Sequence, residues 1–244
     1  KEEARRARCV SNLHQIHLAT TMYADDNSGS LFFVGSASAP AIPNDGQWTR
    51  DPKTEVLLNP SDSLAYWGVA YVGYLGGSGG KTLFRCPSAR HVDEWRDAGR
   101  NYPTEFWLNS SYGVCQYLVA PYSSKAKPHA KLADLLNPQT TIFCQDAAEQ
   151  REEGDDGDSL ALFPGQTQIL YEWIGNPPGT GGYSASFYHL YPFQWEWFRH
   201  NQRCNTLWVG GNVSQIRFKG YNVGVDYRWY TGDTPLQTPT FSVD

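Results

Sequence analysis

The first 28 residues of the chain contain neither glycine nor proline, the two residues that most disfavour a helix. The apolar residues of this stretch recur at roughly helical spacing; they are Val10, Leu13, Ile16, Leu18, Met22 and Tyr23. Residues 25–29 predict its end, because Asn27 and Gly29 suit the left-handed conformation that often closes a helix. The sequence therefore predicts one long amphipathic helix over residues 1–26.

A β-hairpin is predicted near the other end of the chain. In residues 206–209, Leu207 and Val209 alternate with Thr206 and Trp208, as in a strand with two different faces. The turn residues follow directly, and they are Gly210, Gly211 and Asn212. They suit the positive φ angles of a tight turn, so residues 213–218 are expected to return as the second strand.

Between these two segments the sequence predicts short elements separated by long loops. Residues 111–119 and 140–145 are expected to be strands, and residues 225–230 a further strand. Residues 60–72 are expected to hold a short helix, and residues 131–136 a short helix or turn that ends before Pro138. The combined pattern predicts an α+β fold with large loop insertions.

Composition excludes some classes of function. The 244 residues carry a net charge of −5, which argues against nucleic acid as a partner, because phosphate binding requires clustered Lys and Arg. Nine Trp, 15 Tyr and 11 Phe favour either a β-rich core or a surface that binds flat ligands such as sugar rings. No run of about 18 apolar residues predicts a membrane span.

The five cysteines form no Cys-x-x-Cys pair, and no histidine follows them at a spacing typical of zinc sites. They allow at most two disulfides, and their spacing alone does not define the pairs. His14 and His17 lie three residues apart on the predicted helix, where they could bind a metal or could simply be partly exposed helix residues. No third ligand is evident, so no metal or other cofactor is predicted.

His200 suggests catalysis, but no nucleophile motif accompanies it. A structural role in fixing the turn before the hairpin is the preferred interpretation. Carboxylates such as Glu105 and Asp146 could be nominated for glycoside hydrolysis, yet their spacing supports no specific pair. We therefore expect no catalytic residues and a protein that is not an enzyme.

Several segments, in order along the chain, resemble one family of bacterial proteins, the prepilin-like proteins related to type II secretion pseudopilins. His200, nine intervening residues and then Gly210-Gly211 resemble the family's C-terminal motif, which has Asp-Gly where this chain has Gly-Gly. The other similar segments are residues 7–16, 22–27, 84–88, 111–114 and 137–146. Gly210 is the main departure, and any binding role of the family's Asp would be lost here.

The resemblance implies a pilin-like protein whose N-terminal membrane segment is missing. Residues 1–28 would be the C-terminal half of a pilin-type helix, and residues 29–244 an α+β head with the helix packed on an antiparallel sheet. The missing part would comprise a short basic leader, a peptidase cleavage site and an apolar helix in the inner membrane. The implied partners are other pilin-like subunits, and the implied location is extracytoplasmic, in the periplasm or at the cell surface.

Two sites follow from the same resemblance. Cys9 and Cys86 belong to two family-like segments and are expected to form a disulfide between the helix and the sheet; two buried thiols are the alternative. The acidic loop 152–158 could bind calcium, as a loop does in some secretion pseudopilins, although it lacks the EF-hand spacing.

The expected function is therefore that of a pseudopilin-like subunit in filament assembly or protein export. A carbohydrate-binding module is the alternative, based on aromatic residues before the hairpin that could bind a glycan. These are Tyr188, Tyr191, Trp195 and Trp197. A glycan or a secreted protein is accordingly a further possible partner.

Overall fold

The structure is a computed structural model, and it describes residues 1–29, 31, 68–90, 111–115, 118, 131–147, 151–152, 194–218 and 229. These residues form an α+β arrangement of one long N-terminal helix and a mainly antiparallel sheet. No helix within the described part of the chain is long and apolar enough to cross a membrane.

The N-terminal helix α1 spans Glu2–Asp26, as predicted. Its first turn holds Glu2 and Glu3, whose negative charge is favourable beside the positive end of the helix dipole. At its other end the Asn27 side chain donates a hydrogen bond to the Tyr23 carbonyl, and Gly29 N–H donates to Ala24 O at 2.7 Å. The positive φ angles fall on Ser28 and Gly29, whereas Asn27 closes the helix through its side chain.

The buried face of α1 differs from the predicted apolar stripe in two positions. Leu13, Ile16 and Tyr23 are buried in the core as expected, but Leu18 and Met22 are exposed, at 61% and 51%. Position 18 lies about 160° around the helix axis from position 16, so one helix cannot bury both against the same sheet. The prediction that all six apolar residues share one face was therefore wrong.

The sheet has the strand order β3-β1-β2-β4-β5. Its four longer strands are antiparallel neighbours: β1 (Tyr112–Cys115), β2 (Ile142–Asp146), β4 (Arg203–Trp208) and β5 (Val213–Arg217). The two-residue strand β3 (Arg151–Glu152) joins the edge in parallel with β1. The strand predicted at 111–119 is the shorter β1. The strand predicted at 140–145 is β2, which begins two residues later and ends one residue later.

The predicted hairpin is formed by β4 and β5, but β4 differs from expectation. It begins at Arg203, three residues before the predicted start, and every residue from Cys204 to Val209 is buried. A strand buried on both faces needs no alternation of polar and apolar residues. Leu207 still alternates with Thr206 and Trp208 along the strand, but both faces are covered, and Val209 belongs to the turn rather than to the strand.

The remaining described elements are short helical segments. They are α2 (Val69–Val72), η2 (Gly73–Leu75), η3 (Gly77–Phe84), η4 (Leu132–Asp134) and α6 (Gln194–Trp197). The short helix or turn expected at 131–136 is η4. Of the helix expected at 60–72 only the last residues are described; of the strand expected at 225–230, only Trp229 is described.

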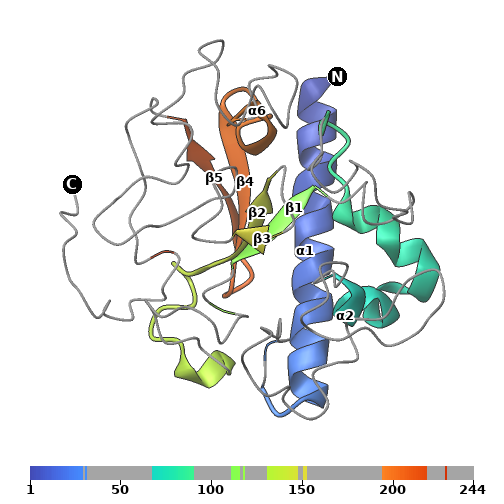
Figure 1. The fold of residues 1–244 in the computed structure, drawn as a ribbon, viewed down its shortest axis with the longest axis vertical. Coiled ribbons are helices and arrows are strands. Elements are labelled where there is room, and N and C mark those ends of the chain that lie inside the picture. The colour runs from blue at the N-terminus through green and yellow to red at the C-terminus, as the bar shows by residue number, and fades with distance from the viewer. Residues whose placement is uncertain are drawn as a thin grey trace, which may run out of the picture.

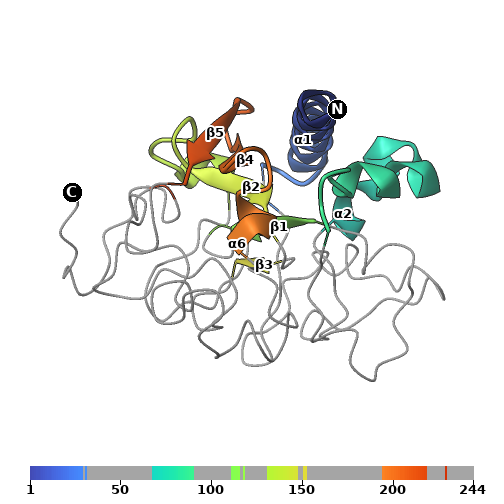
Figure 2. The ribbon, with the colours of Figure 1, turned by 90° about the horizontal axis from the view of Figure 1, so that it is seen from above.

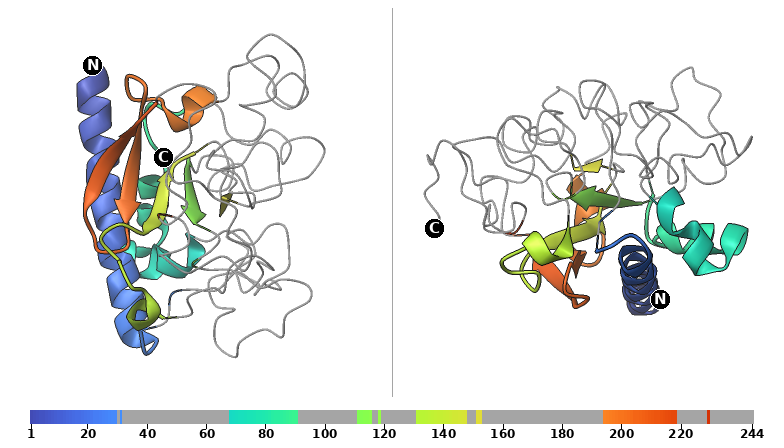
Figure 3. Two further views of the ribbon diagram at one scale, coloured as in Figure 1. Left: turned by 90° about the vertical axis from the view of Figure 1, so that its left-hand side faces the viewer. Right: turned by 90° about the horizontal axis from the view of Figure 1, so that it is seen from below.

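Helix α1 runs lengthwise beside the sheet (Figure 1) and packs against β4 and against the α2–η3 segment. Seen from above, α1 lies between the β4–β5 hairpin and that segment (Figure 2). In the left panel of Figure 3 the strands separate α1 from α6. One core joins the helix and the sheet, and its most buried large side chains are Tyr71, Phe84, Tyr112, Phe143 and Trp197.

Candidate functional site

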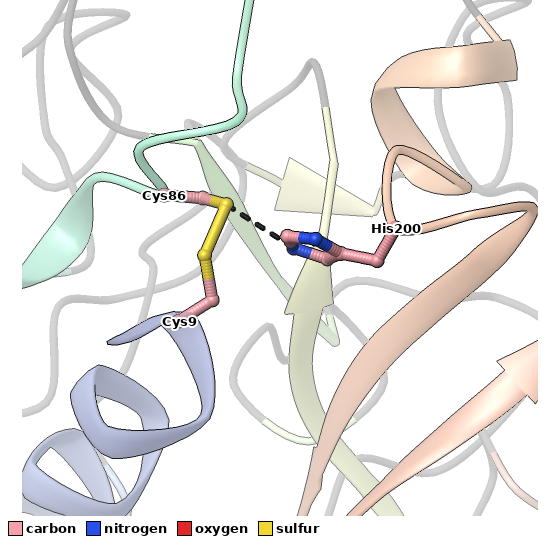
Figure 4. A group of neighbouring side chains, drawn as sticks. All are labelled: Cys9, Cys86 and His200. Atoms are coloured by element: carbon pink, nitrogen blue, oxygen red, sulfur yellow. Dashed lines mark hydrogen bonds between the residues drawn. A yellow bond between two sulfur atoms is a disulfide. The ribbon is translucent and has the colours of Figure 1, made fainter. Parts of the chain in front are cut away.

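Three segments that are far apart in the sequence meet beside the first turns of α1. Cys9 of α1 and Cys86, which follows η3, form a disulfide with a Cα–Cα distance of 5.2 Å. The His200 ring points at this bond, and its Nε2 lies 3.3 Å from Cys86 Sγ (Figure 4). All three residues are buried, with exposed fractions of 1% or less. The disulfide is the pair that the family resemblance implies.

A tight turn presents Cys86 to α1. Pro87 follows Cys86 directly, and Ala89 N–H donates a hydrogen bond to Cys86 O at 3.0 Å, which closes a β-turn with proline at its second position. The Ser111 hydroxyl accepts a hydrogen bond from Cys86 N–H at 2.7 Å. Both contacts hold the Cys86 backbone in place between α1 and the start of β1.

A second tight turn presents His200. Its backbone exchanges hydrogen bonds with Arg203 in both directions, at 3.2 and 3.1 Å. The two residues between them, Asn201 and Gln202, both have positive φ, as in type I′ turns. Gln202 is an unusual residue for this conformation, and its carbonyl accepts a hydrogen bond from Phe218 N–H after β5. His200 therefore begins the turn that leads into β4, and its ring also contacts two other segments.

The Glu2 carboxylate holds the far side of the His200 ring. Glu2 Oε1 accepts hydrogen bonds from His200 Nδ1 at 2.9 Å and from the Ser88 hydroxyl at 2.8 Å. Partial burial raises the pKa of Glu2, but the hydrogen bonds from Ser88 and His200 and the charges of His200 and Arg5 lower it by more. The net effect is a pKa below the ordinary value of 4.5. The negative form of Glu2 is thus the form that this contact stabilises.

Asp146, at the end of β2, is the second carboxylate beside the ring. Its Oδ2 accepts a hydrogen bond from Asn205 N–H at 2.7 Å and lies 3.6 Å from His200 Nε2. Its Oδ1 lies 3.7 Å from the buried Arg199 guanidinium, which also donates to the carbonyls of Ser111 and Ala147. Burial and the negative charge of Asp146 raise the pKa of Tyr112 well above its ordinary value, although Arg199 lowers it in part.

The predicted turn residues lie at the opposite end of β4. Trp208 N–H donates to Asn212 O and Gly211 N–H donates to Trp208 O, and Gly211 is the only one of the three predicted turn residues with a positive φ, at 91°. This is a three-residue loop with a bulge glycine, so the expectation that Gly210 and Asn212 also need positive φ was wrong. A Cβ atom at Gly211 would overlap the ring of His17, and one at Gly210 would overlap the side-chain amide of Gln139.

The other candidate sites are dispersed or only partly described. Among the described residues the one group of three potential metal ligands is Cys9, Cys86 and His200, so no third ligand accompanies His14 and His17 there. Burial and His14 lower the pKa of His17. Glu105 lies outside the described residues. So does all of the acidic loop 152–158 except Glu152, which lies in β3.

The aromatic surface proposed for sugar binding is contradicted at one of its residues. Trp197 is fully buried. Trp195 is partly buried and packs edge-to-face on Phe218, with ring centroids 5.4 Å apart. Tyr188 and Tyr191 lie outside the described residues. Of the two described residues, Trp195 packs beside the end of β5 and Trp197 belongs to the buried core, so Trp197 offers no face to a sugar.

Sequence reasoning found Cys9, Cys86 and His200 and named Asp146 only as a carboxylate that could be nominated for hydrolysis, but it missed Glu2 and Arg199. Glu2 belongs to a charged run, and nothing in that run distinguishes it from Glu3. Arg199 precedes His200 without a local signal of its own, whereas an acid at the end of an apolar strand is the local signal that marks Asp146. Their pairing spans more than 50 residues and is a product of the sheet order.

This group of residues can cross-link three segments and hold one histidine in a defined orientation. Among the described residues, no serine, threonine or cysteine is presented to solvent beside His200 as a nucleophile. Comparison of the chain with protein-family models, with curated proteins and with solved structures finds no match.

Proposed function

We propose that the protein is a pseudopilin-like subunit that assembles through α1 and presents an α+β head. The observation that carries this proposal is the two-sided character of α1. One side of the helix is buried on the sheet, and the opposite side has a stripe of exposed residues that has His14 in its middle and no Asp, Glu, Lys or Arg before Asp25. This stripe, the α1 outer face, consists of Ala4, Ala7, Ser11, His14, Leu18 and Met22.

The composition of the α1 outer face suits contact with another helix. Its first half has small side chains, which allow two helix backbones to approach closely, and its second half has two large apolar ones. Exposed large apolar side chains that lie one helical turn apart form a local apolar surface, which a partner helix would cover. Leu18 and Met22 provide such a pair.

The charges on α1 suit a staggered arrangement of parallel copies. Near its start the basic Arg5, Arg6 and Arg8 outnumber the acidic Glu2 and Glu3, whereas Asp25 and Asp26 lie at its end. Moving one parallel copy by 17 residues, or about 25 Å along the axis, brings Asp25 beside Arg8 of its neighbour. Copies without a stagger would place like charges side by side. In this proposal an apolar helical segment encoded upstream of Lys1 continues α1 into the inner membrane before assembly.

The proposal is tested with the full coding sequence, expressed in a bacterial host with its own secretion machinery. Replacing both Leu18 and Met22 by Asp should reduce assembled material, collected after shearing of cells, by at least about tenfold, because charges would be buried between helices. Leu136→Asp is the matched control, since Leu136 is 71% exposed and lies outside α1. Normal assembly of the double variant would refute the role of this face.

A simpler observation tests the other part of the proposal. The codons upstream of Lys1 should encode a short basic leader and about 20 predominantly apolar residues, the length that spans a bilayer as a helix. An upstream sequence without such a segment would contradict the proposal, whatever the behaviour of the Asp variants.

A further inference from the structure

We propose that the reduced form of the Cys9–Cys86 pair is a zinc site, with His200 Nε2 as the third ligand. The disulfide and the metal would be alternative cross-links between the same three segments. This inference is independent of the assembly proposed above, because it concerns only the buried face of α1. Two thiolates and an imidazole nitrogen are ligands that Zn²⁺ prefers.

The distance between Cys86 and His200 already suits two ligands of one tetrahedral zinc. With Zn–S near 2.3 Å and Zn–N near 2.05 Å, a sulfur and a nitrogen on one tetrahedral zinc lie about 3.5 Å apart. Cys86 Sγ and His200 Nε2 lie 3.3 Å apart. Taking one ligand atom from each of the three residues, these atoms lie within 4.8 Å of one another. On a tetrahedral zinc the two sulfurs would lie about 3.8 Å apart, and breaking their bond allows them to separate.

The neighbours of His200 orient its ring so that Nε2, the nitrogen proposed to bind zinc, faces the sulfurs. Because the Glu2 carboxylate can only accept, His200 Nδ1 carries the proton in their 2.9 Å hydrogen bond, and Nε2 can then offer its lone pair. A carboxylate behind a ligating histidine is a common second layer of zinc sites. Asp146 Oδ2 lies 3.6 Å from the same Nε2, but its oxygens do not lie within 4.8 Å of all three ligand atoms, so Asp146 is a neighbour of the site rather than its fourth ligand.

Reduction of the disulfide and binding of zinc conserve electrons and protons. A dithiol reductant transfers two electrons and two protons to the Cys9–Cys86 bond and itself becomes a disulfide. Zn²⁺ then displaces one proton from each of the two thiols, so binding releases two protons. Because the disulfide is buried, the natural opportunity for metal binding is before the chain has oxidised and folded around it.

The test uses this chain, unfolded with a dithiol and refolded without oxygen in the presence of Zn²⁺ or Co²⁺. The expected results are one zinc per chain by elemental analysis and a thiolate-to-cobalt charge-transfer band. Cys9 and Cys86 should also be protected from alkylation, as seen by peptide mass mapping. Refolded protein that binds no zinc and shows no such band overturns the proposal, and so does bound zinc with both cysteines alkylated.

Variants identify the ligands. Replacing both Cys9 and Cys86 by Ser should abolish the charge-transfer band, whereas Cys115→Ala, which removes another buried thiol, should retain it. Glu2→Gln should weaken zinc binding about 10- to 100-fold, as loss of a second-layer carboxylate does. A band that survives in the double Ser variant would place the metal elsewhere and overturn the proposal.

Discussion

At the scale of single residues, the contact between the β4–β5 turn and α1 depends on the absence of a side chain at Gly211. This residue combines a φ of 91° with close approach to the His17 ring. Gly29 has a similar φ of 78°, but a Cβ there would meet nothing within 4 Å. A substitution at Gly29 therefore measures only the cost of the left-handed backbone, whereas one at Gly211 adds the cost of steric overlap with His17.

We expect Gly29→Ala to lower the free energy of unfolding by about 1 kcal/mol, which is the cost of a left-handed alanine. Gly211→Ala should lower it by more than this, because the new methyl group overlaps the His17 ring, which must move aside. Denaturant unfolding measures both values. Adding His17→Ala to Gly211→Ala should recover part of the loss. Equal effects of the two glycine substitutions would contradict the steric explanation.

The Glu2 carboxylate predicts a dependence of stability on pH. Its pKa is lowered in the folded state, so its contribution is complete well above pH 4.5 and disappears as the pH falls through the folded-state pKa. The difference in unfolding free energy between the wild-type protein and Glu2→Gln should therefore be largest near neutral pH and should shrink below about pH 4.5.

Denaturant titrations at several pH values measure this difference. Glu3→Gln is the control, because Glu3 is exposed and pairs with Arg6 at the helix surface. A gap for Glu2→Gln that stays constant between pH 7 and pH 3 would show that the contacts with Ser88 and His200 do not favour the charged carboxylate.

At the scale of elements, those with strong local signals were predictable. The long helix follows from a stretch without glycine or proline, and the β4–β5 hairpin follows from its turn. The start of β4 was not predictable, because Arg203 and Asn205 are poor strand formers in isolation. Asn205 N–H donates to Asp146 and its side-chain oxygen accepts from Gln215, and these two residues lie on the neighbouring strands β2 and β5. These partners are defined only once the sheet has formed.

The candidate site, like the elements, was predictable only where the sequence carried a local or family signal. The disulfide could be proposed from the family resemblance, whereas the spacing of five cysteines leaves many pairings open. The contacts of His200 with Glu2 and Asp146 join residues that are 198 and 54 positions apart. The periodicity of the sequence carries no information about such pairs, so the orientation of the ring could come only from the structure.

At the scale of the whole molecule, the disulfide is the one covalent link between α1 and the rest of the described structure apart from the chain itself. It joins residues separated by 77 positions. In the chain-entropy view, closing a loop of this length stabilises the folded state by about 4 kcal/mol. Replacing both Cys9 and Cys86 by Ala should therefore lower the unfolding free energy by about this amount.

Chemical unfolding with and without a dithiol measures the effect, with a metal chelator present in both series. The wild-type protein should lose stability when it is reduced, and the double Ala variant should be unaffected by the dithiol. A variant as stable as the oxidised wild-type protein would show that packing and the Glu2–His200 contact alone hold α1 in place.

The position of Cys9 also has a mechanical consequence. A force applied along α1 from its first turn would reach the disulfide after about two helical turns and would pass through Cys86 to the backbone beside β1. The later part of the helix, from Leu13 to Tyr23, would carry little of the load, so its apolar contacts would not break one after another. Detaching α1 by pulling would require breaking a covalent bond or unfolding the head, and a reducing environment would weaken this attachment.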